Sequence, residues 1–357
     1  MSGFWARLRG AATQRRPTEL IAVLIAGIGL GVGLAAVGLG RGAQRAPTPA
    51  LAQQPAESTK PLGPATAGAQ PGRDDDEVGT ATGQARSPAA IGQSTPPVLD
   101  AGANASFEQL ASSLPGPIEL AVAPLGSGKP RTLGANTAAP GWSTTKVAVL
   151  TALLQAKEED LTADEQSWAE SAITESNNQS VLDLFHELER IEGGLVGASG
   201  YMQELLRHSG DEETTVATAP PPAGAVTTFG QTEWKPSNAV KFFSALARGC
   251  LLAPRGTSYV LGLMQRIEPS ESWGLGSAGF ASVAFKGGWG PEPNGAYLVR
   301  QSGIVDVGSS RAVAVAIVAF PPAGAGSFET GTAMLTDTAA WLRAHLKLAP
   351  RSRVACP

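Results

Sequence analysis

The chain has 357 residues, with 27 Lys and Arg against 31 Asp and Glu, and its net charge of −4 gives no electrostatic case for binding nucleic acid. The three histidines lack the spacing of metal ligands, so we expect neither a metal site nor a cofactor; they are His186, His208 and His345. Nothing in the composition indicates an oligomeric state.

The N-terminal segment has the properties of a membrane anchor. The run from Leu20 to Leu39 contains no charged residue and is long enough to cross a hydrocarbon core as a helix. Four arginines precede it, namely Arg7, Arg9, Arg15 and Arg16. The positive-inside rule therefore places residues 1–18 in the cytoplasm, a single transmembrane helix at 19–40 and the rest of the chain outside the cell. The alternative is a cleaved signal peptide, which would make the protein secreted.

Residues 41–98 are dense in Ala, Pro, Gly, Gln, Ser and Thr and contain few large apolar residues. Such a segment cannot bury enough surface to offset the entropy lost on ordering. We therefore expect a disordered linker that holds a folded domain away from the membrane. That domain would span residues 99–350, enough for a substantial core, and a short tail of residues 351–357 would follow it.

Ser143 and Lys146 stand three residues apart at the start of an apolar run, Val147 to Leu154, that predicts a buried helix. Positions i and i+3 share a helix face, so the hydroxyl and the amine can come within hydrogen-bond reach. A serine hydroxyl is a poor nucleophile until a base takes its proton, and a buried lysine can be that base because desolvation lowers its pKa. The alternative for an isolated Ser-x-x-Lys pattern is a solvated helix face.

A second polar segment, Ser176-Asn177-Asn178, lies between two predicted helices, Asp164 to Ile173 and Gln179 to Glu192. Ser and Asn favour such a junction because they cap helix ends. The functional alternative is a serine that relays a proton and an amide that orients a substrate.

A third segment places Lys286 before Gly287 and Gly288, inside an alternating run from Ala281 to Gly290 that predicts a strand. Glycines in a strand indicate a close backbone approach on one side, or alternatively a hairpin turn. Further strands are predicted at Tyr297 to Val307 and Ala312 to Phe320, and a last helix at about Thr330 to Leu346.

Together the three segments resemble the penicillin-recognising serine hydrolases, most closely the class A β-lactamases, which carry Ser-x-x-Lys, Ser-Asp-Asn and Lys-Thr-Gly in this order. The resemblance runs from about Ser106 to Leu348. It implies a β-lactamase/transpeptidase-like fold, an α/β (α+β) sandwich in which helices flank an antiparallel sheet. Ser143 would then begin a central helix and face Lys286 across a cleft.

The resemblance also implies roles for individual residues. Ser143 would attack a carbonyl and become acylated, Lys146 would be the base, and Ser176 would pass a proton to the leaving nitrogen. The backbone N–H groups of Ser143 and Trp289 would form an oxyanion hole. The implied substrate-binding residues are Asn178, which orients the substrate, Lys286, which holds its carboxylate, and Gly287, Gly288 and Trp289.

This chain departs from the class A pattern in ways that affect the expected chemistry. Asn177 stands where the family has Asp, and Gly287 replaces a Thr or Ser whose hydroxyl touches the substrate carboxylate. The loop Ala217 to Gly224 corresponds to the Ω-loop but contains no acid for deacylation, and three nearby acids do not match the pattern, namely Glu212, Glu213 and Glu233. The spacing from Ser143 to Ser176 is short, which predicts a reduced helical subdomain.

Three functions remain open. The first is an acylase of the penicillin-binding type, which reacts with a β-lactam or a peptidoglycan peptide and deacylates weakly or not at all. The second is a true β-lactamase with an atypical deacylating base. The third is a non-catalytic module that keeps the fold for contact with the cell wall or a partner.

The two cysteines, Cys250 and Cys356, would be allowed to form a disulfide outside the cell, but spacing alone does not decide whether they do. Trp234 and Trp273 could line the cleft, although core packing is the commoner use of tryptophan.

Overall fold

The computed structural model describes residues 98–125, 129–292, 295–309, 312–324, 326–347 and 356–357. The chain divides into two units, and every described residue belongs to the second, Arg86–Pro357. The predicted cytoplasmic tail and transmembrane helix, and all of the predicted linker except Val98, lie outside the described residues. Of the helices that the structure does describe, none combines the length and apolar character needed to cross a membrane.

The second unit is built on one five-stranded antiparallel sheet with the strand order β2-β1-β5-β4-β3. The strands are β1 Ile118–Pro124, β2 Arg131–Leu133, β3 Val283–Pro291, β4 Tyr297–Val305 and β5 Val313–Ala319. The central strand β5 reads Val-Ala-Val-Ala-Ile-Val-Ala and is buried along its whole length. A strand that is apolar on both faces needs cover on both sides of the sheet.

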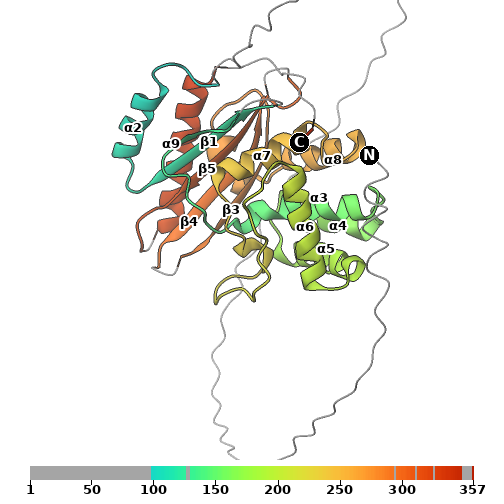
Figure 1. The fold of residues 1–357 in the computed structure, drawn as a ribbon. Coiled ribbons are helices and arrows are strands. Elements are labelled where there is room, and N and C mark those ends of the chain that lie inside the picture. Colours follow the sequence, from blue (N-terminus) through green and yellow to red (C-terminus); the bar gives the residue numbers. More distant parts are fainter. Residues whose placement is uncertain (1–97, 126–128, 293–294, 310–311, 325, 348–355) are drawn as a thin grey trace, which may run out of the picture. The chain divides into compact units, whose positions relative to one another are not determined.

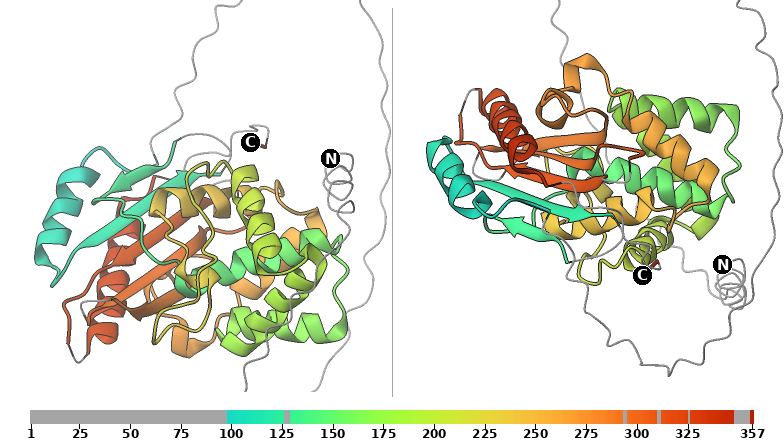
Figure 2. Two further views of the ribbon diagram at one scale, coloured as in Figure 1. Left: turned by 60° about the horizontal axis from the view of Figure 1, so that its bottom comes forward. Right: turned by 90° about the horizontal axis from the view of Figure 1, so that it is seen from above.

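Helices supply that cover (Figure 1). On one face lie α2, Ala103–Ser113, and α9, Ser327–His345. On the other face α7, Pro236–Ala247, packs against β1, β4 and β5. The remaining helices form a group beyond the β3 edge, which Figure 2 shows in the view from above: α3 Lys146–Ala156, α4 Ala163–Thr174, α5 Asn178–Glu192, α6 Leu195–His208 and α8 Pro254–Met264.

The helix that follows the Ser-x-x-Lys segment is the centre of that group. Every residue of α3 except Gln155 is buried, and α3 packs against α4, α5, α6 and α8. A helix that is apolar all round must be surrounded by other elements, so the predicted central helix is confirmed.

Local sequence signals set the helix boundaries around this core. Thr162 and Glu165 form a reciprocal capping box that starts α4. Asn177 caps α5, because its side chain accepts a hydrogen bond from Ser180 N at 2.9 Å, and Gly193 ends the helix in the left-handed conformation. The polar junction between α4 and α5 therefore serves as the N-terminal cap of α5 and is also a candidate site.

The predicted α/β architecture, an antiparallel sheet flanked by helices, is confirmed. The predicted helices at Asp164–Ile173 and Gln179–Glu192 match α4 and α5 to within a residue or two, and the three predicted strands match β3, β4 and β5. The sequence analysis did not identify α2, β1, β2 or α8, and α9 begins three residues earlier than expected.

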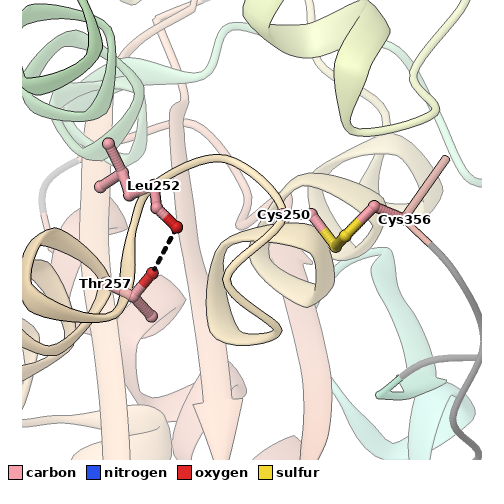
Figure 3. The surroundings of a disulfide bond; sticks show 4 residues. All are labelled: Cys250, Leu252, Thr257 and Cys356. Carbon is pink, nitrogen blue, oxygen red and sulfur yellow. Dashed lines mark hydrogen bonds between the residues drawn. A yellow bond between two sulfur atoms is a disulfide. The ribbon is translucent and has the colours of Figure 1, made fainter. Parts of the chain in front are cut away.

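The two cysteines are joined in a disulfide between the end of α7 and the C-terminal tail (Figure 3). Cys250 follows Gly249, which has a left-handed φ of +73°, and the Cα atoms of the two cysteines are 5.4 Å apart. The bond spans 106 residues of chain and so fastens the segment after α9 to the body of the domain.

We expect reduction of this disulfide to lower the melting temperature by about 5–10 °C, because a crosslink that closes a long loop removes about 2–4 kcal/mol of entropy from the unfolded state. Thermal unfolding with and without a reductant measures the shift. The double variant Cys250→Ser/Cys356→Ser is the control and should be insensitive to the reductant. Equal melting temperatures for the reduced and oxidised wild type would contradict the expectation.

Candidate active site

Ser143 lies in a tight turn that begins the buried helix. A 3₁₀ segment, η1 (Trp142–Thr145), leads directly into α3, and Ser143 is half-buried within it. Trp142 has a φ of +45°, a conformation that a bulky side chain rarely adopts. Thr145 Oγ1 stabilises it by donating to Trp142 O at 2.6 Å. Such local strain persists only where the surroundings hold it, and it is concentrated at functional sites.

The edge strand β3 approaches this turn closely. A Cβ atom on Gly288 would lie 2.8 Å from Ser143 N and 2.9 Å from Thr144 N, so no residue larger than glycine fits there without a backbone shift. On the next glycine, Gly290, a Cβ would meet the Trp142 ring at 2.2 Å. The glycines of β3 therefore bring the backbone of the strand close to the backbone of the turn that holds Ser143.

Lys146 is buried behind the turn and is held by the Ser176–Asn178 segment. Its Nζ donates to Asn178 Oδ1 at 2.9 Å and to the backbone carbonyl oxygen of Ser176, and it lies 3.4 Å from Ser176 Oγ. No hydrogen bond joins Lys146 Nζ to Ser143 Oγ in the described part of the chain. The structure thus brings Lys146 to the second segment rather than directly to Ser143.

Ser176 lies between the two lysines. Lys286 Nζ donates to Ser176 Oγ at 2.8 Å from the opposite side. Ser176 has a left-handed φ of +55°, which is unusual for serine and follows from its place between the end of α4 and the cap of α5. One hydroxyl therefore contacts both amines, and the three predicted segments meet at this atom.

Sequence reasoning missed one member of the cluster, Glu271. Its Oε2 lies 3.0 Å from Lys286 Nζ, and its side chain is only 13% exposed. It belongs to the short 3₁₀ segment η3, Pro269–Glu271, and is one of two acids in a polar stretch, so nothing in the sequence distinguishes it. Lys286 is fully buried and also donates to Gly287 O at 3.2 Å.

Burial sets the charge state of the two lysines. Burial and, to a lesser extent, the positive charge of Lys286 lower the pKa of Lys146 to about 6, although the carboxylate of Glu271 opposes both effects. Burial also lowers the pKa of Lys286, while Glu271 raises it through its charge and its hydrogen bond. Lys146 is thus largely a neutral amine at pH 7, beside a second buried lysine that has a carboxylate partner.

Aromatic side chains occupy the space next to Gly287. A Cβ on Gly287 would stand 3.1 Å from two ring atoms of Trp273. The Trp273 ring also packs edge-on against Trp289 and Phe328, with centroids 6.1 and 6.2 Å away. Trp273 therefore explains physically why a Thr or Ser is replaced by glycine at this position, whereas Trp234 is a core residue that is 1% exposed.

The loop between α6 and α7 is pinned but brings no acid to the lysines. The buried carboxylate of Asp211 accepts from Thr214 N at 3.1 Å and from Trp234 Nε1 at 3.0 Å. The three acids noted in the sequence lie elsewhere: Glu213 pairs with Lys235 at 2.9 Å, and Glu212 and Glu233 are exposed. None of them hydrogen-bonds to Lys146.

A cavity of about 330 Å³ lies at this loop, lined by Ala138, Glu213, Thr214, Thr215, Gln231, Glu233, Lys235 and Asn238. None of the predicted site residues lines it. Among the described residues, no group of three or more His, Cys, Asp and Glu side chains could hold a metal ion.

The fold matches solved β-lactamases, whereas the sequence matches neither a protein-family model nor a curated protein. The chromosome-encoded β-lactamase of Vibrio parahaemolyticus has a TM-score of 0.53 at 14% identity, over 68% of this chain and 98% of that chain. The TLA-1 extended spectrum β-lactamase gives 0.54 at 14% identity, and an ancestral class A β-lactamase (GNCA) gives 0.51 at 14% identity, with the same coverages. The chain therefore has the β-lactamase-like fold of the class A enzymes.

We expect the amine of Lys146 to titrate near pH 6, far below the ordinary lysine value, because its charged form is desolvated. A titration of lysine side-chain resonances by NMR measures this, and the variant Lys146→Met, which keeps the volume and removes the amine, assigns the signal. A Lys146 signal that titrates near pH 10 would contradict the expectation.

We expect Gly288→Ala to destabilise the domain by about 1–3 kcal/mol, because the added methyl group would meet the backbone of η1. Denaturant unfolding gives the value. Gly262→Ala is the matched control, since nothing lies within 4 Å of a Cβ there and alanine favours the helix α8. Equal stability of the two variants would show that β3 does not press on the turn.

Proposed function

We propose that this chain is a serine hydrolase of the class A β-lactamase-like type that is acylated at Ser143 by β-lactams or peptidoglycan-type amides and deacylates weakly or not at all. The observation that carries the proposal is the Lys146–Ser176–Lys286 cluster, in which a neutral buried amine lies one helical turn from a serine in a strained turn.

Lys146 is the base in this proposal. A neutral amine has two N–H donors and one lone pair. The carbonyl oxygen of Ser176 and Asn178 Oδ1 accept the two N–H groups, which leaves the lone pair for the proton of Ser143. Catalytic hydrogen bonds are often incomplete before substrate binds, so the missing Ser143–Lys146 bond is compatible with this role.

Ser176 delivers the proton to the leaving group. As Ser143 Oγ bonds to the acyl carbon, the C–N bond breaks and the nitrogen needs a proton. The Ser176 hydroxyl donates it and regains one from Lys146, which has just received the proton of Ser143. The ammonium of Lys286, 2.8 Å from Ser176 Oγ, stabilises negative charge that develops on that oxygen.

The oxyanion hole in this proposal consists of the backbone N–H groups of Ser143 and Trp289. The close approach of β3 at Gly288, the residue before Trp289, supports this pairing because it brings the strand backbone to within contact of the turn. Asn178 orients the substrate amide while it holds Lys146.

Weak deacylation follows from the environment of the lysines. Hydrolysis of the acyl-enzyme requires a base that activates water, which class A enzymes take from a glutamate on the Ω-loop. Here Glu271 is the only acid that hydrogen-bonds to the lysine cluster among the described residues, and it is paired with Lys286. The short segment between Ser143 and Ser176, which holds only α3 and α4, supports a reduced helical wall.

We place the domain outside the cytoplasm. The Cys250–Cys356 disulfide supports an oxidising compartment. The apolar run from Leu20 to Leu39, with arginines before it, supports a single-pass anchor, or a signal peptide if it is cleaved. Peptidoglycan peptides would be the natural amides at that location.

We expect the intact mass of the soluble domain to increase by one penicillin and to stay increased for hours, because Ser143 is acylated and no base hydrolyses the product. Ser143→Ala should show no increase. The time course by mass spectrometry, with hydrolysed penicillin assayed in the same tube, measures both steps.

Two other results would redirect the assignment. Hydrolysed penicillin without a lasting adduct would identify a true β-lactamase with an unrecognised base. Intact penicillin and no adduct would refute acylation by β-lactams and favour the non-catalytic module.

A further inference from the structure

The ammonium of Lys286 has no N–H left for a substrate. An ammonium has three N–H donors, and those of Lys286 go to Ser176 Oγ at 2.8 Å, Glu271 Oε2 at 3.0 Å and Gly287 O at 3.2 Å. The side chain is fully buried, and one of its three partners is already a carboxylate. A substrate carboxylate would have to displace Glu271 and would meet its negative charge.

The segment that carries Glu271 is held at both ends. Before it, Glu268 N donates to Thr174 O at 3.0 Å, next to the end of α4. After it, the buried Gln301 of β4 donates to Trp273 O at 2.8 Å and accepts from Leu275 N at 2.7 Å. These hydrogen bonds fix the backbone on both sides of Glu271. They therefore hold its carboxylate in place next to Lys286.

The same segment fills the space where a polar group beside Gly287 would stand. The ring of Trp273 leaves only 3.1 Å to a Cβ at Gly287, and Trp289 lies against it. Both tryptophans are half-buried, so they present apolar surface beside the second half of β3, next to the turn that holds Ser143. This surface favours an apolar group and offers no ammonium or guanidinium to an anion.

The nearest buried cation on the adjacent strand uses its terminal N–H groups within the protein, although its Nε has no hydrogen-bond partner among the described residues. Arg300 pairs with Gly288 in the β3–β4 register and is fully buried. Its guanidinium donates to the backbone carbonyl oxygens of Ala139, Pro140 and Trp234. It therefore fastens the chain before the nucleophile turn to the chain before α7, and these donors are not available to a substrate.

We propose that the site selects acyl donors whose leaving portion is uncharged and apolar beside the scissile C–N bond, and that Glu271 and Trp273 discriminate against a carboxylate there. The inference rests on the proposed function, because it names the substrate class for acylation of Ser143. The chemistry is unchanged: the Ser143 Oγ–carbon bond forms, the C–N bond breaks and the nitrogen leaves with the proton from Ser176.

The test compares a penicillin with its primary carboxamide, which has nearly the same shape and no charge. Initial acylation rates come from intact-mass time courses at equal concentrations. We expect the carboxamide to acylate the wild type about tenfold faster or more, since the carboxylate of Glu271 offsets the attraction of Lys286 for an anion and adds like-charge repulsion at short range. Because both probes use the same nucleophile, their rate ratio cancels general effects on Ser143.

Glu271→Gln removes the charge and keeps the shape, so the rate ratio should fall about tenfold as Lys286 becomes open to the carboxylate. Glu268→Gln is the matched control, an exposed acid three residues away, and should keep the wild-type ratio. A carboxylate that reacts as fast as the carboxamide in the wild type, or a ratio unchanged in Glu271→Gln, would overturn this inference and leave Ser143 acylation standing. No reaction with either probe would refute the proposed function and this inference with it.

Discussion

Two buried lysines that share one serine hydroxyl are the constraint on which the site depends. Placing Lys146 and Lys286 on either side of Ser176 brings two like charges into a low-dielectric interior, which is unfavourable unless one is neutralised and the other paired. Burial shifts Lys146 to the neutral amine, and Glu271 pairs with Lys286. The same arrangement that resolves the electrostatic conflict leaves Lys146 as a neutral amine, the form that the proposed base requires.

The backbone adopts strained conformations at two junctions between elements that hold this cluster. Trp142 and Ser176 both adopt left-handed φ values, one at the start of α3 and one between α4 and α5. Packing of the surrounding elements offsets this backbone strain. The helix α3 is buried on all sides, and β3 contacts the turn that holds Ser143 through glycine. Stability is thus concentrated in the sheet and the central helix, while strain lies at the candidate site, as is common in enzymes.

The pairing of Lys286 with Glu271 links the burial of the lysine to the charge of the substrate proposed for the site. The carboxylate lowers the cost of burying the lysine, and in the proposed function it excludes an anionic substrate group from Lys286. Because the loop Ala217 to Gly224 brings no acid to Lys146, we propose that the site forms an acyl-enzyme from an uncharged amide and does not turn over an anionic antibiotic rapidly. The fold, shared with class A β-lactamases at 12–16% identity, does not by itself distinguish these activities.

The sequence by itself determined the three polar segments, the helices around them and the strand that carries Lys286, because capping residues, apolar periodicity and in-strand glycines are local signals. It also indicated the missing acid in the Ω-like loop. Only the tertiary structure decided that Ser176 contacts both lysines, that Cys250 and Cys356 are bonded and that Glu271 and Trp273 belong to the site. These depend on contacts between segments far apart in the chain, and an acid such as Glu271 looks like any solvated acid until the fold buries a lysine beside it.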